Sequence, residues 1–261
     1  MAHPLENSTP ILPGITLAFP FPRPLVSIVH MAKLRIEKLP KCKGRTLIIG
    51  DIHGCLDELQ SIIKQFHPKK HDRILTVGDM INRGPDSRGT LQFARKMGIL
   101  SVLGNHEKRL LKAWKEGDRS QLKRRSRKTY KVLKDVDWEW ISTWPHVFNI
   151  PSLMALVVHG GFLPNRKWKD QAPSDVTFVQ VVDHRGHPFK RAQGMNARPW
   201  ADFWMGKKHV FYGHTPRDRP ILHARATGLD TGCVYGNTLT AVSLPDFTFY
   251  KIQAPRAYAD D

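Results

Sequence analysis

Side chains able to bind metal ions recur in five short glycine-containing motifs along this chain. In order, the motifs are Gly50-Asp51-Ile52-His53-Gly54, Gly78-Asp79 through Asn82-Arg83-Gly84, Gly104-Asn105-His106-Glu107, His159-Gly160-Gly161 and Gly213-His214-Thr215. They offer carboxylate, imidazole and amide ligands, a mixture that suits Mn, Fe or Zn better than Ca. Two adjacent ions of this kind can activate one water and hold the oxygens of an in-line displacement. The candidate ligands are Asp51, His53, Asp79, Asn105, His159 and His214.

Most of these motifs follow an apolar run that is typical of a β-strand. We expect strands over residues 46–50, 73–78, 99–103, 153–158 and 209–212. Helices are expected over residues 56–66 and 87–97, and the alternation is typical of βαβ units. The motifs would therefore lie at the carboxyl ends of strands, where open α/β sheets build their sites. Three closing strands are expected at residues 227–230, 238–244 and 248–252.

The order of the motifs resembles the calcineurin-like metallophosphoesterases, specifically the phosphoprotein phosphatase family, over residues 46–252. The resemblance implies an α/β fold, a four-layer α/β/β/α sandwich. It implies cofactors as well, two divalent metal ions that are Mn, or else Fe or Zn. The first ion would be held by Asp51, His53 and Asp79. Asp79 would bridge to a second ion held by Asn105, His159 and His214.

The same resemblance gives roles to residues beside the ligands. His106 is expected to protonate the leaving oxygen, and Arg83 is expected to hold the phosphoryl oxygens with its planar guanidinium. Arg198 is a second phosphate-binding candidate, and a surface or structural role explains it equally well. We interpret the histidines outside these motifs as surface or packing residues: His146, His184, His187, His209 and His223.

Asn82 occupies a position where protein serine/threonine phosphatases usually carry a second Asp. Followed by Arg83-Gly84-Pro85-Asp86-Ser87, it is similar to the ApaH-like branch around bacterial diadenosine tetraphosphate hydrolase, some members of which cleave polyphosphate or mRNA caps. An amide can orient His106 but lacks the charge that raises the pKa of an imidazole. This matters least when the leaving group is a phosphate, whose second pKa is about 6. A turn or capping role is the alternative for Asn82.

The charge of the chain is strongly positive, +18 with a pI near 10.1. Such a charge favours a polyanionic phosphate substrate, and RNA or a nucleotide is a further candidate partner. Residues 108–134 hold twelve Lys or Arg against two acidic residues, directly after the His106 motif. We expect a basic helical segment that steers a long anion to the metals. A solvated helical face that serves only solubility is the alternative.

The 261 residues suffice for one full hydrophobic core. We expect a flexible N-terminal extension over residues 1–30 and a single domain over residues 31–261, with a frayed tail after Pro255. The three cysteines show no disulfide framework, which favours a reducing compartment and a cytoplasmic location. Cys55 and Cys233 are interpreted as buried packing residues. No apolar run reaches the length of a membrane span.

These observations favour a dinuclear metal-dependent phosphohydrolase. It would cleave phosphoanhydrides (diadenosine polyphosphates, polyphosphate or nucleotide caps) by attack of a metal-bound hydroxide. The first alternative is a protein serine/threonine or tyrosine phosphatase on the same scaffold, against which Asn82 argues. The second is an RNA or polyphosphate binder without catalysis, against which the full ligand set argues. The native metal, the protein partners and the oligomeric state stay open.

Overall fold

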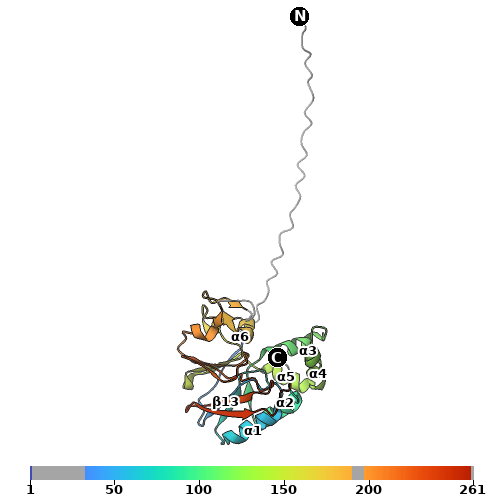
Figure 1. Cartoon of the computed structure of the whole chain (residues 1–261), viewed down its shortest axis with the longest axis vertical. Helices are drawn as coiled ribbons and strands as arrows, with labels where there is room; N and C mark the ends of the chain where they lie inside the picture. Colours follow the sequence, from blue (N-terminus) through green and yellow to red (C-terminus); the bar gives the residue numbers. More distant parts are fainter. Residues whose placement is uncertain (2–32, 190–196, 260–261) are drawn as a thin grey trace. The chain divides into compact units, whose positions relative to one another are not determined.

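Two β-sheets form the centre of the fold (Figure 1). The computed structural model describes Met1, residues 33–189 and residues 197–259. In the first sheet, β2, β3 and β4 run parallel, and β13 and β14 complete the order β14-β13-β2-β3-β4 with antiparallel pairing. Its strands are β2 (Thr46–Ile49), β3 (Arg73–Thr76), β4 (Leu100–Ser101), β13 (Thr238–Leu244) and β14 (Thr248–Gln253).

The second sheet has the order β1-β5-β6-β10-β12-β11, in which β6, β10 and β12 run parallel to one another. Its strands are β1 (Ile36–Lys38), β5 (Val147–Ile150), β6 (Ala155–Val158), β10 (His209–Tyr212), β11 (Ile221–His223) and β12 (Ala226–Gly228). The strands expected before the five motifs are therefore divided between the two sheets, three in the first and two in the second.

The alternation of side chains along each strand explains how the layers stack. In β2, Leu47 and Ile49 join the hydrophobic cluster beneath the helices, whereas Ile48 joins a cluster shared with the second sheet. In β6, Val157 joins that shared cluster, and Leu156 faces the outer layer. Because successive side chains of a strand point to opposite faces, the two sheets pack against each other and carry one further layer each. The expected four-layer sandwich is confirmed.

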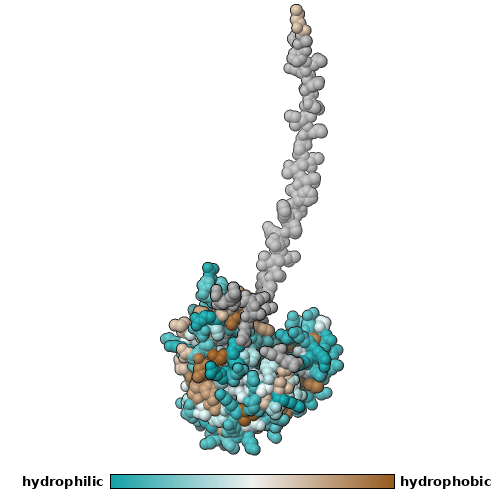
Figure 2. All heavy atoms as spheres, in the orientation of Figure 1, coloured by the Kyte–Doolittle hydropathy of each residue, from teal (hydrophilic) through white to brown (hydrophobic). Residues whose placement is uncertain are grey.

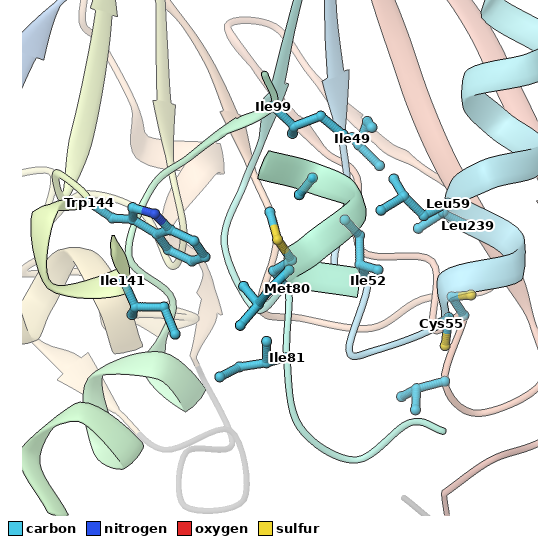
Figure 3. Packing of buried hydrophobic residues seen from close by; sticks show 14 of the residues in the cluster. Ile49, Ile52, Cys55, Leu59, Met80, Ile81, Ile99, Ile141, Trp144 and Leu239 are labelled. Carbon is cyan, nitrogen blue, oxygen red and sulfur yellow. The ribbon is translucent and has the colours of Figure 1, made fainter. Parts of the chain in front are cut away.

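Helices α1 (Leu56–Phe66) and α2 (Ser87–Lys96) cover the outer face of the first sheet, and they connect its parallel strands. Figure 1 shows them on the opposite side of the sheets from α6 (Pro173–Phe178). Figure 3 shows how this core packs: Ile49, Leu59 and Leu239 gather beside α1, and Met80 and Ile81 approach Ile141 and Trp144.

The basic segment is two helices rather than one. Helix α3 (Asn105–Glu116) ends at Gly117, whose φ of +66° is the left-handed conformation that commonly ends a helix. Helix α4 (Arg124–Val132) follows after a short connection, and α5 (Asp135–Thr143) comes next. Trp138 of α5 stacks on Trp114 of α3, with ring centroids 6.3 Å apart, and it also packs on Tyr130 of α4 at 5.5 Å, so α5 supports the other two helices.

Residues 164–206 form several short elements, within the part that the structure describes. They contain α6, the 3-10 helices η2 (Trp168–Asp170) and η4 (Trp200–Phe203), and a small sheet of β7 (Val181–Val182), β8 (Pro188–Phe189) and β9 (Arg198–Pro199). A 3-10 turn, η1 (Pro151–Leu153), precedes β6. None of the described helices is long and apolar enough to cross a bilayer.

The tail after Pro255 is not frayed as far as Ala259, so that expectation is wrong. Ala257 forms a β-bridge with Tyr235, Ala259 is buried, and the Tyr258 hydroxyl donates to Glu58 Oε1 at 2.8 Å. The contact with Glu58 attaches the tail to α1. The expectation about residues 1–30 lies outside the described residues apart from Met1.

Candidate dinuclear metal centre

The expected ligands come together from loops that begin at the carboxyl ends of five strands. Asp51 and His53 follow β2, Asp79 follows β3, and Asn105 opens α3 after β4. From the second sheet, His159 follows β6 directly, and His214 follows β10 after one glycine. Asp51, His53, Asp79, Asn105 and His159 are buried and His214 is partly buried.

Asp79 lies at the middle of this cluster. Its Oδ2 is 3.6 Å from His53 Nε2 and 3.4 Å from His159 Nε2. Two groups of potential ligands, His53-Asp79-His106 and Asp79-His159-His214, share this one carboxylate. Asp79 therefore has the position that a bridging ligand between two ions requires.

Backbone carbonyls orient two of the imidazoles. His53 Nδ1 lies 3.2 Å from the Ile81 carbonyl oxygen, and His159 Nδ1 lies 2.9 Å from the Val77 carbonyl oxygen. An Nδ1–H that donates to a carbonyl leaves Nε2 unprotonated, which is the form that binds a metal. His159 Nε2 also lies 3.1 Å from Asn105 Oδ1, as expected of two ligands that face one ion. His214 contacts the Phe178 carbonyl through Nε2 at 3.2 Å, which leaves Nδ1 for a metal.

The carboxylates are arranged so that they need cations. Burial, followed by the neighbouring carboxyls of Asp230 and Asp79, raises the pKa of Asp51 well above its usual range. Burial also raises the pKa of Asp79 to about 7 and that of Asp230 to about 6. Divalent ions among these groups would offset the cost of burying their charges.

The histidines have the complementary property. Burial lowers the pKa of His53 to about 3, that of His214 to about 3 and that of His159 to about 4. A neutral imidazole is the form that ligates a metal, so the ring nitrogens need no deprotonation at neutral pH. The donor set therefore fits divalent metals, and the metal dependence of such a site follows from its own residues.

Asp230 is a further acidic residue at this site, one that is not among the candidate ligands named from the sequence. It follows β12 as the other acidic residues follow their strands, and its carboxyl is near enough to that of Asp51 to raise the pKa of Asp51. The Asp51 carboxylate also accepts from the His214 backbone N–H, at 3.1 Å to Oδ2. Because Asp230 follows an apolar strand in the chain, the sequence itself contains the pattern that places a carboxylate here.

Glu107 has a structural role that its place in the motif did not reveal. Its carboxylate accepts from the backbone N–H groups of Asp79 at 3.0 Å, Ile81 at 3.0 Å and Gly104 at 3.1 Å. The Asp79 loop is thereby attached to the start of α3. Burial raises the pKa of Glu107 well above its usual range, and the nearby charge of Asp79 adds to this effect.

Backbone strain concentrates at the cluster. His53, Asp79, Asn82, Arg83 and His214 have φ values of +53°, +46°, +76°, +71° and +68°. Non-glycine residues rarely adopt this left-handed conformation, and they keep it only where the surrounding structure enforces it. Gly213 shows how tight the packing is, because a Cβ atom there would lie 1.9 Å from Asp51 Oδ1.

His106 stands at one side of the cluster, on the first turn of α3. Its backbone N–H donates to Asp79 Oδ1 at 3.0 Å, and its Nε2 lies 3.9 Å from Asp79 Oδ2. Its Nδ1 lies 2.7 Å from Asn82 Nδ2, so Asn82 contacts the imidazole directly. The pKa of His106 is strongly lowered by burial and, after it, by the neighbouring His53.

The two expected arginines lie in different surroundings. Arg83 borders the same space as Asn82 and His106, and it donates to the hydroxyl of Tyr235, to which sequence reasoning assigned no role. Arg198 lies on β9, where its guanidinium pairs with Asp202 at 3.1 Å and its side chain is 64% exposed. The described contacts of Arg198 do not include the metal-binding cluster, so its proposed role in phosphate binding stays a prediction.

A large cavity opens beside His106. Its volume is about 1380 Å³, and Asn82, Arg83 and His106 lie in its wall together with residues of α4 and the C-terminal tail. The lining contains nine basic residues and, among the described residues, one acidic residue, Asp86. The basic ones are Arg83, Arg88, Arg109, Lys123, Arg124, Arg125, Lys128, Lys131 and Arg256. Figure 2 shows the hydrophilic surface over α3 and α4. We call this cavity the basic groove.

Other expectations concern residues outside the cluster. Cys55 and Cys233 are buried, as expected, and lie near Glu58 behind the Asp51 loop. His146 is buried and accepts from the Arg35 backbone N–H at 3.0 Å, a packing role. His209 and His223 contact Thr227 and Asp202, at 2.8 Å each. His184 and His187 precede the undescribed stretch, and His187 pairs with Asp183.

Comparisons with known proteins agree with this geometry. The family model of the calcineurin-like phosphoesterases matches residues 44–218. The asymmetrical bis(5'-nucleosyl)-tetraphosphatase PrpE of Oceanobacillus iheyensis is 26% identical over 234 residues, which cover 81% of this chain and 93% of the relative. Serine/threonine-protein phosphatase 1 of Salmonella typhimurium is 29% identical over 204 residues, which cover 74% of this chain and 88% of the relative.

Solved structures agree as well. The crystal structure of a candidate diadenosine tetraphosphatase superposes with a TM-score of 0.77 and 30% identity, covering 85% of this chain and 98% of that chain. A yeast protein serine/threonine phosphatase superposes with a TM-score of 0.57 at 14% identity, which reflects the shared fold alone.

Proposed function

The chain belongs to the calcineurin-like phosphoesterases, a family of metal-dependent hydrolases, and we propose that it cleaves phosphoanhydride bonds with two divalent ions. The observation that carries this proposal is the position of Asp79, whose carboxylate lies between His53 and His159 at 3.6 and 3.4 Å. One carboxylate shared by two ligand groups is the arrangement that a dinuclear centre needs.

The ligands divide into two groups around that carboxylate. Asp51, His53 and Asp79 would hold the first ion. The second ion would be held by Asp79, Asn105, His159 and His214. Carboxylate, imidazole and amide donors favour Mn, Fe or Zn. When bound, the ions supply an activated water at neutral pH and stabilise the charge of the phosphoryl group.

The chain's own residues supply the remaining tasks. Arg83 lines the basic groove, where its guanidinium can bind two phosphoryl oxygens at once. The Tyr235 hydroxyl accepts from the Arg83 guanidinium and helps to hold it in place. His106 directs Nε2 toward the cluster and would donate to the leaving oxygen, while Asn82 contacts the other ring nitrogen.

Asn82 favours anhydrides over phosphoserine. The amide places no negative charge beside His106, so nothing at that position strengthens the hold of the imidazole on a proton. A serine alkoxide needs that proton to leave, whereas a phosphate leaves as a stable anion. The resemblance to tetraphosphatases agrees with this preference, since those relatives are described as acting on bis(5'-nucleosyl) tetraphosphates.

The basic groove favours extended anions. His106, which would donate to the leaving oxygen, lies in its wall together with nine cations. Diadenosine polyphosphates, inorganic polyphosphate and nucleotide caps all place several phosphates beyond the one that is attacked. The groove would bind those phosphates, which is the steering role expected of the basic segment.

A protein serine/threonine phosphatase is the second candidate function. The observation in its favour is the 29% identity to serine/threonine-protein phosphatase 1 of Salmonella typhimurium. The same metal centre would serve either reaction, so the choice depends on the leaving group.

Product analysis separates the two functions. The Mn-loaded protein would be incubated with diadenosine tetraphosphate, long polyphosphate, capped RNA and a phosphoserine peptide, and the products resolved by anion-exchange chromatography. We expect preferred cleavage of an anhydride, and the fragments identify the bond that is cut. Preference for the phosphopeptide would refute the anhydride assignment. Asp79→Asn is the control, and it should abolish turnover and reduce the bound metal below two ions per chain.

Replacing Asn82 tests the reason for the preference. Asn82→Asp restores a carboxylate beside His106, so the rate on phosphopeptide should rise relative to the rate on polyphosphate. An unchanged ratio, in a variant that still binds its metals, would contradict the explanation from leaving-group basicity.

A further inference from the structure

Helix α4 has an unusual buried face. Of its nine residues, all within the described part of the chain, Ser126 and Thr129 are the buried ones, at 4% and 6% exposure. A surface helix ordinarily buries an apolar stripe. Here the two residues that face the protein both carry a hydroxyl group. This indicates a specific polar contact beneath the helix.

That contact is the side chain of Asn82. Thr129 Oγ1 donates to Asn82 Oδ1 at 3.1 Å, and Asn82 Nδ2 donates to Ser126 Oγ at 3.1 Å. The remaining bond of Nδ2 goes to His106 Nδ1 at 2.7 Å. The amide therefore lies between α4 and His106, and each of its polar atoms has a partner.

The backbone of Asn82 is also fixed. Its N–H donates to Ser87 Oγ at 2.9 Å, and its φ of +76° is in the left-handed region. With the main chain held, the remaining freedom of the residue is rotation of the side chain. Two hydroxyls of α4 oppose that rotation, because turning the amide away from His106 would break both bonds and leave buried polar atoms unpaired.

We infer that Ser126 and Thr129 are positioning residues for the reaction. They hold the Asn82 amide against His106 Nδ1, and the amide in turn holds the imidazole with Nε2 toward the cluster, 3.9 Å from Asp79 Oδ2. The inference rests on the proposed function, because it takes His106 as the group that donates to the leaving oxygen. It assigns to α4 a second task beside the display of basic residues.

Both tasks concern the same side of the reaction. Arg124, Lys128 and Lys131 of α4 line the basic groove, and His106 lies in the same wall. The helix that would bind the phosphates of the leaving group thus also orients the residue that assists its departure. In the observed orientation Thr129 donates to the amide oxygen and Ser126 accepts from the amide nitrogen, so each hydroxyl matches one end of the amide.

The experiment compares two leaving groups on one phosphoryl group. Phenyl phosphate has a basic leaving group that needs a hydrogen-bond donor, whereas 4-nitrophenyl phosphate has a leaving group that departs without one. In the Mn-loaded full chain, Thr129→Val should lower kcat for phenyl phosphate by about tenfold, a fraction of the usual contribution of general acid catalysis. Its kcat for 4-nitrophenyl phosphate should change by less than about twofold, with KM unchanged for both. Ser126→Ala should act in the same direction.

Matched variants separate positioning from folding. Thr129→Ser keeps the hydroxyl and should restore the wild-type ratio of the two rates. Thr90→Val removes another buried helical hydroxyl, one that donates to the Asp86 carbonyl at 2.7 Å on α2, and should leave the ratio unchanged. In an Asn82→Ala background, Thr129→Val should have no further effect on the ratio, because the residue through which it acts is gone.

Equal loss on both substrates, or an undiminished effect of Thr129→Val in the Asn82→Ala background, would overturn the inference. A wild-type protein that cleaves aryl phosphates but no anhydride would remove the anhydride assignment, and the ratio would still decide the role of α4. A wild-type protein that cleaves neither would overturn both.

Discussion

Neutralising the basic groove should change the salt dependence of polyanion binding by a calculable amount. The variant is Arg124→Gln/Lys128→Gln/Lys131→Gln, which removes three of the nine cations in the lining. Each phosphate contact of a flexible chain contributes about −0.7 to the slope of log affinity against log salt. A chain that uses six of the nine cations would therefore have a slope of about −4, and the variant a slope of about −2.

The difference is large enough to measure. Between roughly 50 and 200 mM salt, wild-type affinity should fall about 300-fold and variant affinity about 20-fold. Binding of a polyphosphate of defined length would be followed by calorimetry, in an Asp79→Asn background so that the ligand is not consumed. Both proteins should be compared at each salt concentration, since a single condition cannot separate the slope from the intrinsic affinity.

A control with the same change in net charge isolates the groove. Lys38→Gln/Lys64→Gln/Lys251→Gln alters three exposed lysines on β1, α1 and β14, none of which lines the groove. Its slope should match that of the wild type. If the groove variant also kept the wild-type slope, or if the control lost as much as the groove variant, the steering role of α4 would be refuted and the positive charge would serve solubility.

Three further changes test other parts of the structure. Gly213→Ala would place a Cβ atom 1.9 Å from Asp51 Oδ1, so we expect metal content by elemental analysis and turnover to fall while the circular dichroism spectrum is kept. Trp138→Ala removes a buried indole between α3 and α5, and should lower the free energy of unfolding by about 3–5 kcal/mol in urea titrations. The Asp72 carboxylate pairs with Arg45 at 2.6 Å. Burial raises the pKa of Asp72, but hydrogen bonds from Arg45 and from the Lys69 backbone outweigh this effect and lower the pKa below its usual value. Because the folded pKa is depressed, the stability it contributes is present above about pH 4 and lost at lower pH, so Asp72→Asn should destabilise at pH 7 and less at pH 3.

Much of the metal-binding cluster is predictable from sequence for a physical reason. Ligands that must meet at one point have to leave the sheets at the same edge, so each follows a buried apolar strand directly. The runs before Asp51, Asp79 and His159 are apolar and short, and the structure places strands there within a few residues of the expected bounds. Asp230 satisfies the same criterion after β12, so its place at the site was also predictable from the sequence.

The residues around the metal-binding cluster are harder to predict from the sequence. Ser126 and Thr129 stand in a run of basic residues whose pattern indicates a solvated helix, and their burial depends on Asn82, more than forty positions away. Tyr235 likewise reaches Arg83 only through the fold. Gly117 is an exception, because a glycine within the basic segment does signal the end of α3.

The neutral amide at position 82 and the charge of the basic groove are connected. Asn82 is buried in the wall of a cavity whose described lining contains nine cations and one acid. A carboxylate there would need a cationic partner, since a buried unpaired charge is costly, and the nearest sources are His106 and the arginines of the groove. The amide is satisfied by hydrogen bonds alone and leaves those cations to the substrate. Asn82→Asp should therefore weaken polyphosphate binding severalfold in the Asp79→Asn background, in addition to changing the preference for leaving groups. Calorimetry at low salt tests this, and equal affinities of the two proteins would show that the groove and position 82 act independently.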